Sequence, residues 1–332
     1  MTLASKKSPT PPFIVIAHRG ASGYLPEHTL EAKALAIGMG ADFVEQDIVI
    51  TKDGVPIVTH DIFLEDVTDI AARFPGRGRT HGHFYAIDFT IDELKTLTRY
   101  ERLDDNAGAV FPGRFPRTSC RFAVITLAEE IEFVQGINKS AGKNVGLYTE
   151  VKFPAWHRAQ GQDVTRITLD TLARHGYTRR ADNIFFQCFD ALELKRARGE
   201  LTCDLKLIQL IGENSWNEST TDYDAMRTAR GMADVSSYAD GIGPEITQIV
   251  EWPRLRAAPT VKDLASLAKA KGLHVHPYTF RTDQLPPNAP DAVSVLNSLF
   301  DQAQVDGIFT DFTDLVVDYR KARQEKDPRQ GA

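Results

Sequence analysis

Two pairs of polar residues each follow an apolar, strand-like run. His18 and Arg19 come directly after FIVIA, and His60 and Asp61 come directly after PIVT. Histidine has a pKa of about 6.5, so near neutral pH one imidazole can accept a proton while another donates one. Cleavage of a phosphodiester needs both, because the attacking hydroxyl loses a proton and the alkoxide leaving group gains one. His18 and His60 are therefore a candidate acid–base pair, although either one alone is more often a structural histidine. Asp61 either orients His60 or caps the turn.

Three acidic residues and a lysine form the second candidate group. Glu45 and Asp47 lie two residues apart in DFVEQDIVI, and Glu150 and Lys152 do so in YTEVK, which puts each pair on one face of a strand. A single acidic residue in a strand is more often a salt-bridge partner, but burying two unpaired carboxylates is costly. Converging carboxylates require a cation, and oxygen ligands favour Mg²⁺, Ca²⁺ or Mn²⁺ over zinc. Arg19 and Lys152 beside that cation would neutralise the oxygens of a phosphodiester.

The elements that must position these residues follow from an alternation of apolar runs with amphipathic stretches. We expect strands at 13–17, 42–50, 56–59, 145–151, 183–187, 205–210, 239–243, 273–278 and 306–310. We expect helices at 28–38, 127–139, 163–175, 190–199, 261–271, 290–302 and 313–323. Thr126 with Glu129 is a predicted helix capping box, and Thr260 with Asp263 a weaker, acidic one. This alternation predicts a parallel sheet.

The number of strand–helix units decides the fold class. With 56–59 taken as an extension of the second unit there are about eight, which predicts an α/β fold closed as a (β/α)8 TIM barrel. About six would give an open doubly wound sheet, and HRGASG lacks the first glycine of a dinucleotide fingerprint. Strand ends of a barrel form one mouth, to which the later strands add Gln187, Phe189, Gln209, His276, Tyr278, Thr310 and Asp311. His276 either lines or supports the mouth, and His274 starts its strand or faces outward.

One region interrupts the alternation. Residues 62–120 contain RFPGRGR, HGHFYAIDF and FPGRFPR, which are rich in Pro, Gly and Arg, and the region is too long for a plain loop. Thr90 with Glu93 is a further predicted capping box, opening a short helix at 91–98. We interpret the region as a small inserted subdomain after strand two. RFPGRGR is predicted to be a solvated loop, with an anion site as the alternative. His81 and His83 either lie on the surface of the insert or reach over the mouth.

Composition restricts the class of partner. The 332 residues are 42% hydrophobic and 25% charged, with a formal net charge of −6, which argues against nucleic acid or an anionic membrane as the main partner. The three cysteines, Cys120, Cys188 and Cys203, form no metal-binding spacing. No run approaches the ~18 apolar residues of a membrane-spanning helix. The N-terminal MTLASKKSPTPP has no apolar core, so we expect no signal peptide and either a cytosolic protein or a mature or engineered form.

Taken together, the motifs resemble the glycerophosphodiester phosphodiesterase family. The family signature of HR, E-x-D and HD is matched by His18-Arg19, Glu45-Gln46-Asp47 and His60-Asp61. YTEVK, QCFD, YADGIGP, HPYTFR and DGIFTDF follow in the expected order, so the likeness runs from about residue 13 to 320. The long insert looks most like the periplasmic bacterial branch of the family. The family more often has Asn at the position of His28, which affects the start of the first helix or a contact behind the ligands.

The resemblance implies residue roles in one barrel domain over 13–320, with the insertion at about 62–120. It implies one divalent cation, Ca²⁺ first and Mg²⁺ or Mn²⁺ as alternatives, held by Glu45, Asp47 and Glu150. It implies His18 and His60 as the acid–base pair and Arg19 and Lys152 on the phosphate, with Phe189 and Tyr278 placed by position as the wall that packs glycerol.

The implied activity is hydrolysis of glycerophosphodiesters, the deacylated phospholipids, to sn-glycerol 3-phosphate and an alcohol. Two routes are open: attack by the glycerol 2-hydroxyl, which gives a cyclic phosphate, and direct attack by water. The preferred alcohol head group is also open, and a homodimer is possible. The resemblance places the protein in the periplasm, with the cytoplasm as the alternative, and predicts no stable membrane insertion. Two other functions are weighed: a phospholipase D-like barrel, which would need an apolar mouth, and a non-catalytic barrel, which would not need the complete site.

Overall fold

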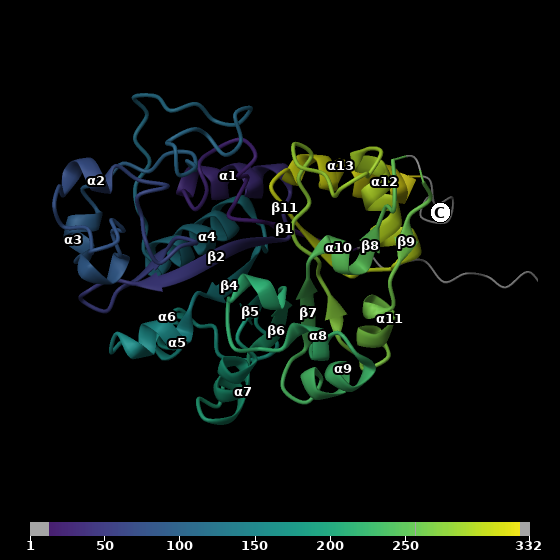
Figure 1. Ribbon diagram of the computed structural model, residues 1–332. Coiled ribbons are helices and arrows are strands. Elements are labelled where there is room, and N and C mark those ends of the chain that lie inside the picture. Colours follow the sequence, from purple (N-terminus) through teal and green to yellow (C-terminus); the bar gives the residue numbers. More distant parts are fainter. Residues whose placement is uncertain (1–12, 256, 326–332) are drawn as a thin grey trace, which may run out of the picture.

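A computed structural model describes residues 13–255 and 257–325, and within them the apolar runs form a barrel (Figure 1). Eight parallel strands of these described residues follow one another in the order β10-β7-β6-β5-β4-β2-β1-β11. Their bounds are β1 Ile14–Ala17, β2 Phe43–Ile50, β4 Gly146–Val151, β5 Ile184–Cys188, β6 Lys206–Ile211, β7 Gly241–Pro244, β10 His274–Val275 and β11 Gly307–Thr310. The predicted (β/α)8 TIM barrel is confirmed.

The barrel is closed between its first and last strands and across the segment after β10. β1 pairs in parallel with β11 over four residues, from Ile14 opposite Gly307 to Ala17 opposite Thr310. On the other side of β11, Asp306 N–H donates to Val275 C=O at 2.9 Å and Phe309 N–H donates to Pro277 C=O at 3.0 Å. The run 273–278, predicted as one strand, is therefore a two-residue strand whose continuation still completes the ring.

The extra strand β3, Pro56–Val58, folds back on β2 in antiparallel pairing. Because β3 runs back along β2, it returns the residues that follow it, His60 and Asp61, to the level of Asp47, whose C=O accepts from the N–H of Thr59 at 2.8 Å. Figure 1 shows β2 as the long strand that reaches out of the barrel toward the helices α2 and α3.

Helices surround the strands and provide the outer layer of the core (Figure 1). The longer helices are α1 Leu30–Met39, α4 Leu127–Ala141, α6 Val164–Arg174, α7 Ala191–Gly199 and α13 Thr313–Glu325. The shorter ones are α5 Pro154–Ala159, α8 Tyr223–Met226, α9 Ala229–Val235, α10 Ile246–Ile249, α11 Leu264–Lys269 and α12 Ala292–Asn297, with single turns η2 Asn214–Trp216 and η3 Ser298–Gln302. Inside the ring, Ile16, Phe43, Tyr148, Phe185, Ile208 and Phe309 form a separate apolar cluster, so the barrel is filled by side chains and is not a pore.

Two of the three predicted capping boxes are confirmed. Thr126 and Thr90 each accept from the backbone N–H three residues on, and Glu129 and Glu93 accept from the backbone N–H of the capping threonines. The prediction for Thr260 is wrong: Thr260 lies in β9, Thr260–Val261, which pairs with β8, Val250–Glu251. Pairing with β8 holds the backbone of Thr260 extended ahead of the helix, and α11 begins after Asp263 without a side-chain cap.

Residues 62–120 lie beside the end of β2 and contain α2 Ile70–Arg73, η1 Ala86–Asp88 and α3 Ile91–Leu94 (Figure 1). They contribute most of an apolar cluster that also includes Val49, Ile57 and Val124. In RFPGRGR, Arg77 pairs with Glu93 and Arg79 pairs with Asp88 at 2.7 Å. These arginines therefore stabilise the segment itself.

Two sequence-based predictions concern termini and membranes. The N-terminal stretch for which no signal peptide is predicted lies outside the described residues. Among the helices that the structure describes, none has the length and the apolar character needed to cross a bilayer.

Candidate active site

The ends of the strands surround one cavity of about 540 Å³ at the mouth of the barrel. The nine residues to which the family resemblance gives a role in the site all line it: His18, Arg19, Glu45, Asp47, His60, Glu150, Lys152, Phe189 and Tyr278. They come from β1, β2, β4, the turn after β3 and the segments after β5 and β10. The barrel thus gathers residues that are up to 260 positions apart in the chain, since Tyr278 and His18 share the cavity.

Glu45, Asp47 and Glu150 form a buried carboxylate cluster. β2 pairs in register with β4, with Asp47 opposite Glu150, so the two strands direct the three side chains to the same place. One carboxylate oxygen from each residue lies within 4.8 Å of the others. Oxygen atoms bound to one Ca²⁺ at about 2.3–2.6 Å would be separated by distances of this order.

Burial disfavours the charged form of two of these three carboxylates. Burial, followed by the nearby charge of Asp47, raises the pKa of Glu45 to about 8. Burial also raises the pKa of Glu150 well above its ordinary value, against the opposing charge of Lys152. Burial would raise the pKa of Asp47 too, but the hydrogen bond from His28 and the charges of His28, His60 and Lys152 hold it well below its ordinary range. Asp47 Oδ1 is buried without a hydrogen-bond partner, so the cluster fits a divalent cation.

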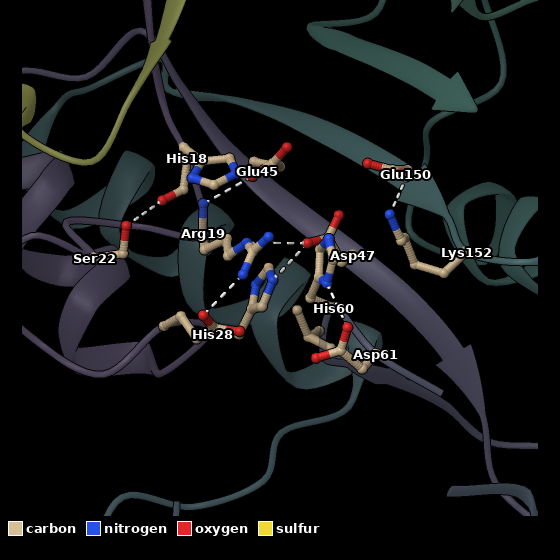
Figure 2. Close-up of polar contacts among 12 residues, drawn as sticks. His18, Arg19, Ser22, His28, Glu45, Asp47, His60, Asp61, Glu150 and Lys152 are labelled. Atoms are coloured by element: carbon tan, nitrogen blue, oxygen red, sulfur yellow. Dashed lines mark hydrogen bonds and ion pairs between the residues drawn. The ribbon is translucent and has the colours of Figure 1, made fainter. Parts of the chain in front are cut away.

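His18 and His60 each have one ring nitrogen held by a carboxylate, and Figure 2 shows this contact for His60 and Asp61. His18 Nδ1 lies 2.6 Å from Asp311 Oδ1, and His60 Nδ1 lies 2.7 Å from Asp61 Oδ1. An ionised carboxylate can only accept, so each Nδ1 carries the hydrogen and each Nε2 is left to exchange a proton. Burial lowers the pKa of His18 to about 4 despite the charge of Asp311, and burial with the charges of Arg19 and Lys152 lowers the pKa of His60. Of the two roles left open for Asp61, the structure shows that it contacts His60.

Arg19 follows β1 in a strained turn. Its φ is +57° and that of Gly20 is +94°, both in the left-handed region that L side chains rarely adopt. In this conformation the backbone N–H of Arg19 donates to Glu45 Oε2 at 2.8 Å. The guanidinium donates to Glu27 Oε2 at 2.8 Å and its Nε lies 3.6 Å from Asp47 Oδ2 (Figure 2). The GASGYLP turn therefore lets the chain leave β1 while Arg19 stays at the cavity.

Lys152, Phe189 and Tyr278 form the opposite wall. Lys152 Nζ is buried, donates to Glu150 Oε1 at 2.7 Å and lies 3.4 Å from Glu218 Oε1. It also lies 5.3 Å from the centre of the Phe189 ring, which packs edge-on against Tyr278 at 5.9 Å between ring centres. The buried ammonium group of Lys152 thus lies next to Glu150 of the carboxylate cluster and next to the ring of Phe189.

The remaining predicted strand-end residues lie behind the cavity or elsewhere in the barrel. Gln187 donates to Glu45 Oε1 at 3.1 Å, and Asp311 holds His18. His276 is buried and hydrogen-bonds Tyr148, so it supports the barrel, and His274 is exposed at the start of β10. Gln209 bonds backbone carbonyls next to β5 and β6, and the hydroxyl of Thr310 accepts from the N–H of Phe312. Gln209 and Thr310 were expected at the mouth, and this expectation is wrong: neither lines the cavity, and Gln209 Oε1 accepts from the Tyr238 hydroxyl.

Of the two roles left open for His28, the structure shows the contact behind the ligands, whereas Glu27 is a contact that the sequence analysis missed. His28 is fully buried and its Nε2 lies 2.9 Å from Asp47 Oδ2, while Thr29 caps α1 (Figure 2). Burial, opposed by Asp47, lowers the pKa of His28 to about 3, so the neutral ring donates to that carboxylate. Glu27 links Arg19 to Arg102, an arginine from the 62–120 segment. The signal for this contact in the sequence was the His of PEHT, at a position where the family more often has Asn.

The mouth of the barrel holds a buried carboxylate cluster that fits a cation, two histidines held by carboxylates, and two basic residues. These features define an enzyme of the phosphodiester hydrolase class. The model of the glycerophosphoryl diester phosphodiesterase family matches residues 18–315. A glycerophosphodiester phosphodiesterase of Haemophilus influenzae is 42% identical over 330 residues, covering 93% of this chain and 90% of its own. One of Treponema pallidum is 35% identical, covering 92% and 91%. The chain belongs to the glycerophosphodiester phosphodiesterase family.

Solved structures show the same fold. A protein from Silicibacter pomeroyi, described as a putative glycerophosphoryl diester phosphodiesterase, superposes with a TM-score of 0.71 at 24% identity, covering 94% of this chain and 95% of its own. A phosphodiesterase from Oleispira antarctica, in complex with the product sn-glycerol-3-phosphate, superposes with a TM-score of 0.62 at 20% identity, covering 92% and 95%. The predicted family and barrel are both confirmed.

Proposed function

We propose that this enzyme hydrolyses glycerophosphodiesters to sn-glycerol 3-phosphate and an alcohol. The observation that carries the proposal is the meeting of Glu45, Asp47 and Glu150 within 4.8 Å in a cavity also lined by His18 and His60. The family supports the substrate class, and the product bound to the Oleispira antarctica relative supports glycerol 3-phosphate as the product that is released.

The three carboxylates would hold one divalent cation, with Ca²⁺ the first candidate and Mg²⁺ or Mn²⁺ the alternatives. When bound, the cation supplies positive charge that stabilises the negative charge developing on the phosphate oxygens. Arg19 and Lys152 act on the same phosphate, since both side chains line the cavity next to the carboxylates. Both are held by carboxylates, Arg19 by Glu27 and Lys152 by Glu150, so they are positioned before the substrate arrives.

His18 and His60 exchange the protons. Each presents its Nε2 while a carboxylate holds Nδ1, so one ring takes the proton of the attacking hydroxyl and the other protonates the departing alkoxide. The attacking group is either the glycerol 2-hydroxyl, which gives a cyclic phosphate, or water. Phe189 and Tyr278 provide an apolar wall on which the carbon face of glycerol packs.

The remaining assignments concern the chain as a whole. Residues 13–320 form one catalytic domain, and the segment 62–120 is an inserted subdomain of that domain. A periplasmic location is supported by the likeness to the periplasmic branch of the family, with the cytoplasm as the alternative. Fractionation of cells that express the full-length gene would distinguish the two locations.

The test is release of glycerol 3-phosphate from glycerophosphocholine, with and without EDTA. We expect EDTA to abolish release and Ca²⁺, Mg²⁺ or Mn²⁺ to restore it. Lysophosphatidylcholine is the comparison substrate for the phospholipase D-like alternative. Full activity in EDTA, or faster turnover of the lysolipid, would contradict the proposal, and tight binding of glycerophosphocholine without turnover would favour a non-catalytic barrel.

A further inference from the structure

Both carboxylates that hold the histidines are themselves held by arginines from the segment 62–120. Arg102 Nη1 donates to Asp61 Oδ2 at 2.6 Å, while Asp61 Oδ1 holds His60. Arg114 Nη2 donates to Asp311 Oδ2 at 2.7 Å, while Asp311 Oδ1 holds His18. The two arrangements are alike, although Asp61 and Asp311 come from opposite ends of the chain. In each of them the carboxylate accepts from a histidine on one oxygen and from an arginine on the other.

These arginines are largely shielded from solvent and each makes several hydrogen bonds. The side chains of Arg102 and Arg114 are 18% and 5% exposed. Arg102 also donates through Nη2 and Nε to both oxygens of Glu27, at 2.7 and 3.1 Å, and Glu27 in turn holds Arg19. Arg114 donates to Asp283 at 2.8 Å and to the backbone C=O of Ser22 at 3.3 Å. Each guanidinium therefore connects the segment 62–120 to parts of the barrel that carry site residues.

A carboxylate that accepts from a histidine can rotate and take the imidazole with it. Fixing its second oxygen by a charge-assisted hydrogen bond removes that freedom and keeps Nε2 aimed into the cavity. Partners that orient metal-binding histidines in the same way change metal affinity or activity by about 10- to 100-fold when removed, and we expect an effect of this order for a histidine that transfers protons.

We propose that Arg102 and Arg114 are positioning residues, through which the segment 62–120 fixes the orientation of each histidine of the acid–base pair. The proposal rests on the function proposed above for His18 and His60. It gives the segment a role in the rate of the reaction. We expect Arg114 to matter less for the rate than Arg102. Arg281 Nε also donates to Asp311 Oδ2, at 2.7 Å, so Arg114 is not the sole arginine that holds Asp311.

The experiment measures kcat and KM for glycerophosphocholine in Arg102→Gln and Arg114→Gln. We expect Arg102→Gln to lower kcat by about 10- to 100-fold with little change in KM. Arg114→Gln should lower kcat by a smaller factor, because Arg281 still holds Asp311. A change confined to KM would show that Arg102 acts only through Glu27 and Arg19 on the phosphate, and would overturn the proposal.

Arg79→Gln is the matched control. Arg79 lies in the same segment and forms a two-bond pair with Asp88, at 2.7 and 2.9 Å, without contacting either histidine carboxylate. We expect its loss to lower the unfolding midpoint in urea while kcat stays near that of the wild type. Equal losses of kcat in Arg79→Gln and Arg102→Gln would mean that the segment matters only through its stability, and would also overturn the proposal.

Double mutants identify the path of the effect. If Arg102 acts through Asp61, the kcat of Arg102→Gln with Asp61→Asn should match that of Asp61→Asn alone, whereas Arg102→Gln with Asp311→Asn should show the product of the two single losses. Multiplicative losses in the first pair would contradict the proposal. His60→Ala and His18→Ala separate this outcome from failure of the proposed function: if they retain full activity, the acid–base assignment itself is wrong.

Discussion

At the scale of single residues, the site depends on imidazoles that keep one nitrogen free. Asp311 and Asp61 hold Nδ1 of His18 and His60, and this leaves the two Nε2 atoms at the cavity. The motifs HR, E-x-D and HD predicted five of the residues that line the cavity, His18, Arg19, Glu45, Asp47 and His60. They could not predict Glu27, Arg102 or Arg114, because a salt bridge between residues tens of positions apart leaves no local pattern in a sequence.

The first prediction concerns the two histidines. His18→Ala and His60→Ala should each lower kcat for glycerophosphocholine by about 10²- to 10⁴-fold, the usual contribution of a positioned acid or base. Binding of Ca²⁺ should be preserved, since neither residue belongs to the carboxylate cluster. Steady-state kinetics and calorimetry check both points. The exposed His81 provides the control, and a His81→Ala enzyme as slow as the other two would contradict the assignment.

At the scale of elements, the turn between β1 and α1 determines where Arg19 lies. Gly20 has a φ of +94°, and a Cβ atom built on it would lie 2.9 Å from the backbone carbon of Ala32 in α1. Gly20→Ala should therefore cost about 1–3 kcal/mol of unfolding free energy, because it adds both strain and a clash with backbone. It should also lower activity by displacing Arg19.

Urea unfolding and activity measurements test this turn. Gly38→Ala is the control, since Gly38 lies in α1 with no atom within 4 Å of an added Cβ. Alanine there should leave stability unchanged or raise it by up to about 1 kcal/mol, owing to its better helix propensity. Equal stabilities for the two variants would show that the left-handed turn is not a requirement of the fold.

Strands and helices were predictable where a periodic apolar pattern meets a terminus signal. The nine predicted strands and the capping boxes at Thr90 and Thr126 are present. The pattern at Thr260 fails because its local signal competes with pairing to β8, a tertiary contact. Short helices such as α5, Pro154–Ala159, were missed because six residues are too few to show a helical period.

At the scale of the whole molecule, the barrel buries neutral histidines that restrict its stability at low pH. His276 is buried, with its Nδ1 2.8 Å from the hydroxyl of Tyr148, and burial, followed by His274, lowers its pKa to about 3. The unfolded chain binds a proton near pH 6.5 and the folded chain does not. The neutral, buried His276 therefore makes its full contribution to the unfolding free energy above about pH 6.5. This contribution is lost as the pH falls below that value, by about 1.4 kcal/mol per pH unit.

His276→Gln should make the unfolding free energy fall less steeply with decreasing pH. Between pH 6.5 and pH 4 we expect its slope to decrease by the equivalent of about one bound proton. Urea unfolding at a series of pH values measures the slope directly, and His81→Gln, which changes an exposed histidine of the 62–120 segment, should leave it as in the wild type. A slope in His276→Gln as steep as that of the wild type would mean that the buried ring is protonated in the folded state.

The proposed activity depends on one cation held by carboxylates of β2 and β4 at the mouth of the barrel. The most direct measurement is isothermal titration calorimetry of EDTA-treated protein with Ca²⁺, and in parallel with Mg²⁺ and Mn²⁺. We expect one site per chain in the wild type and in His60→Ala, and loss of that site in Asp47→Asn and in Glu150→Gln. Unchanged binding in both carboxylate variants, or no binding of any of the three ions to the wild type, would contradict the account.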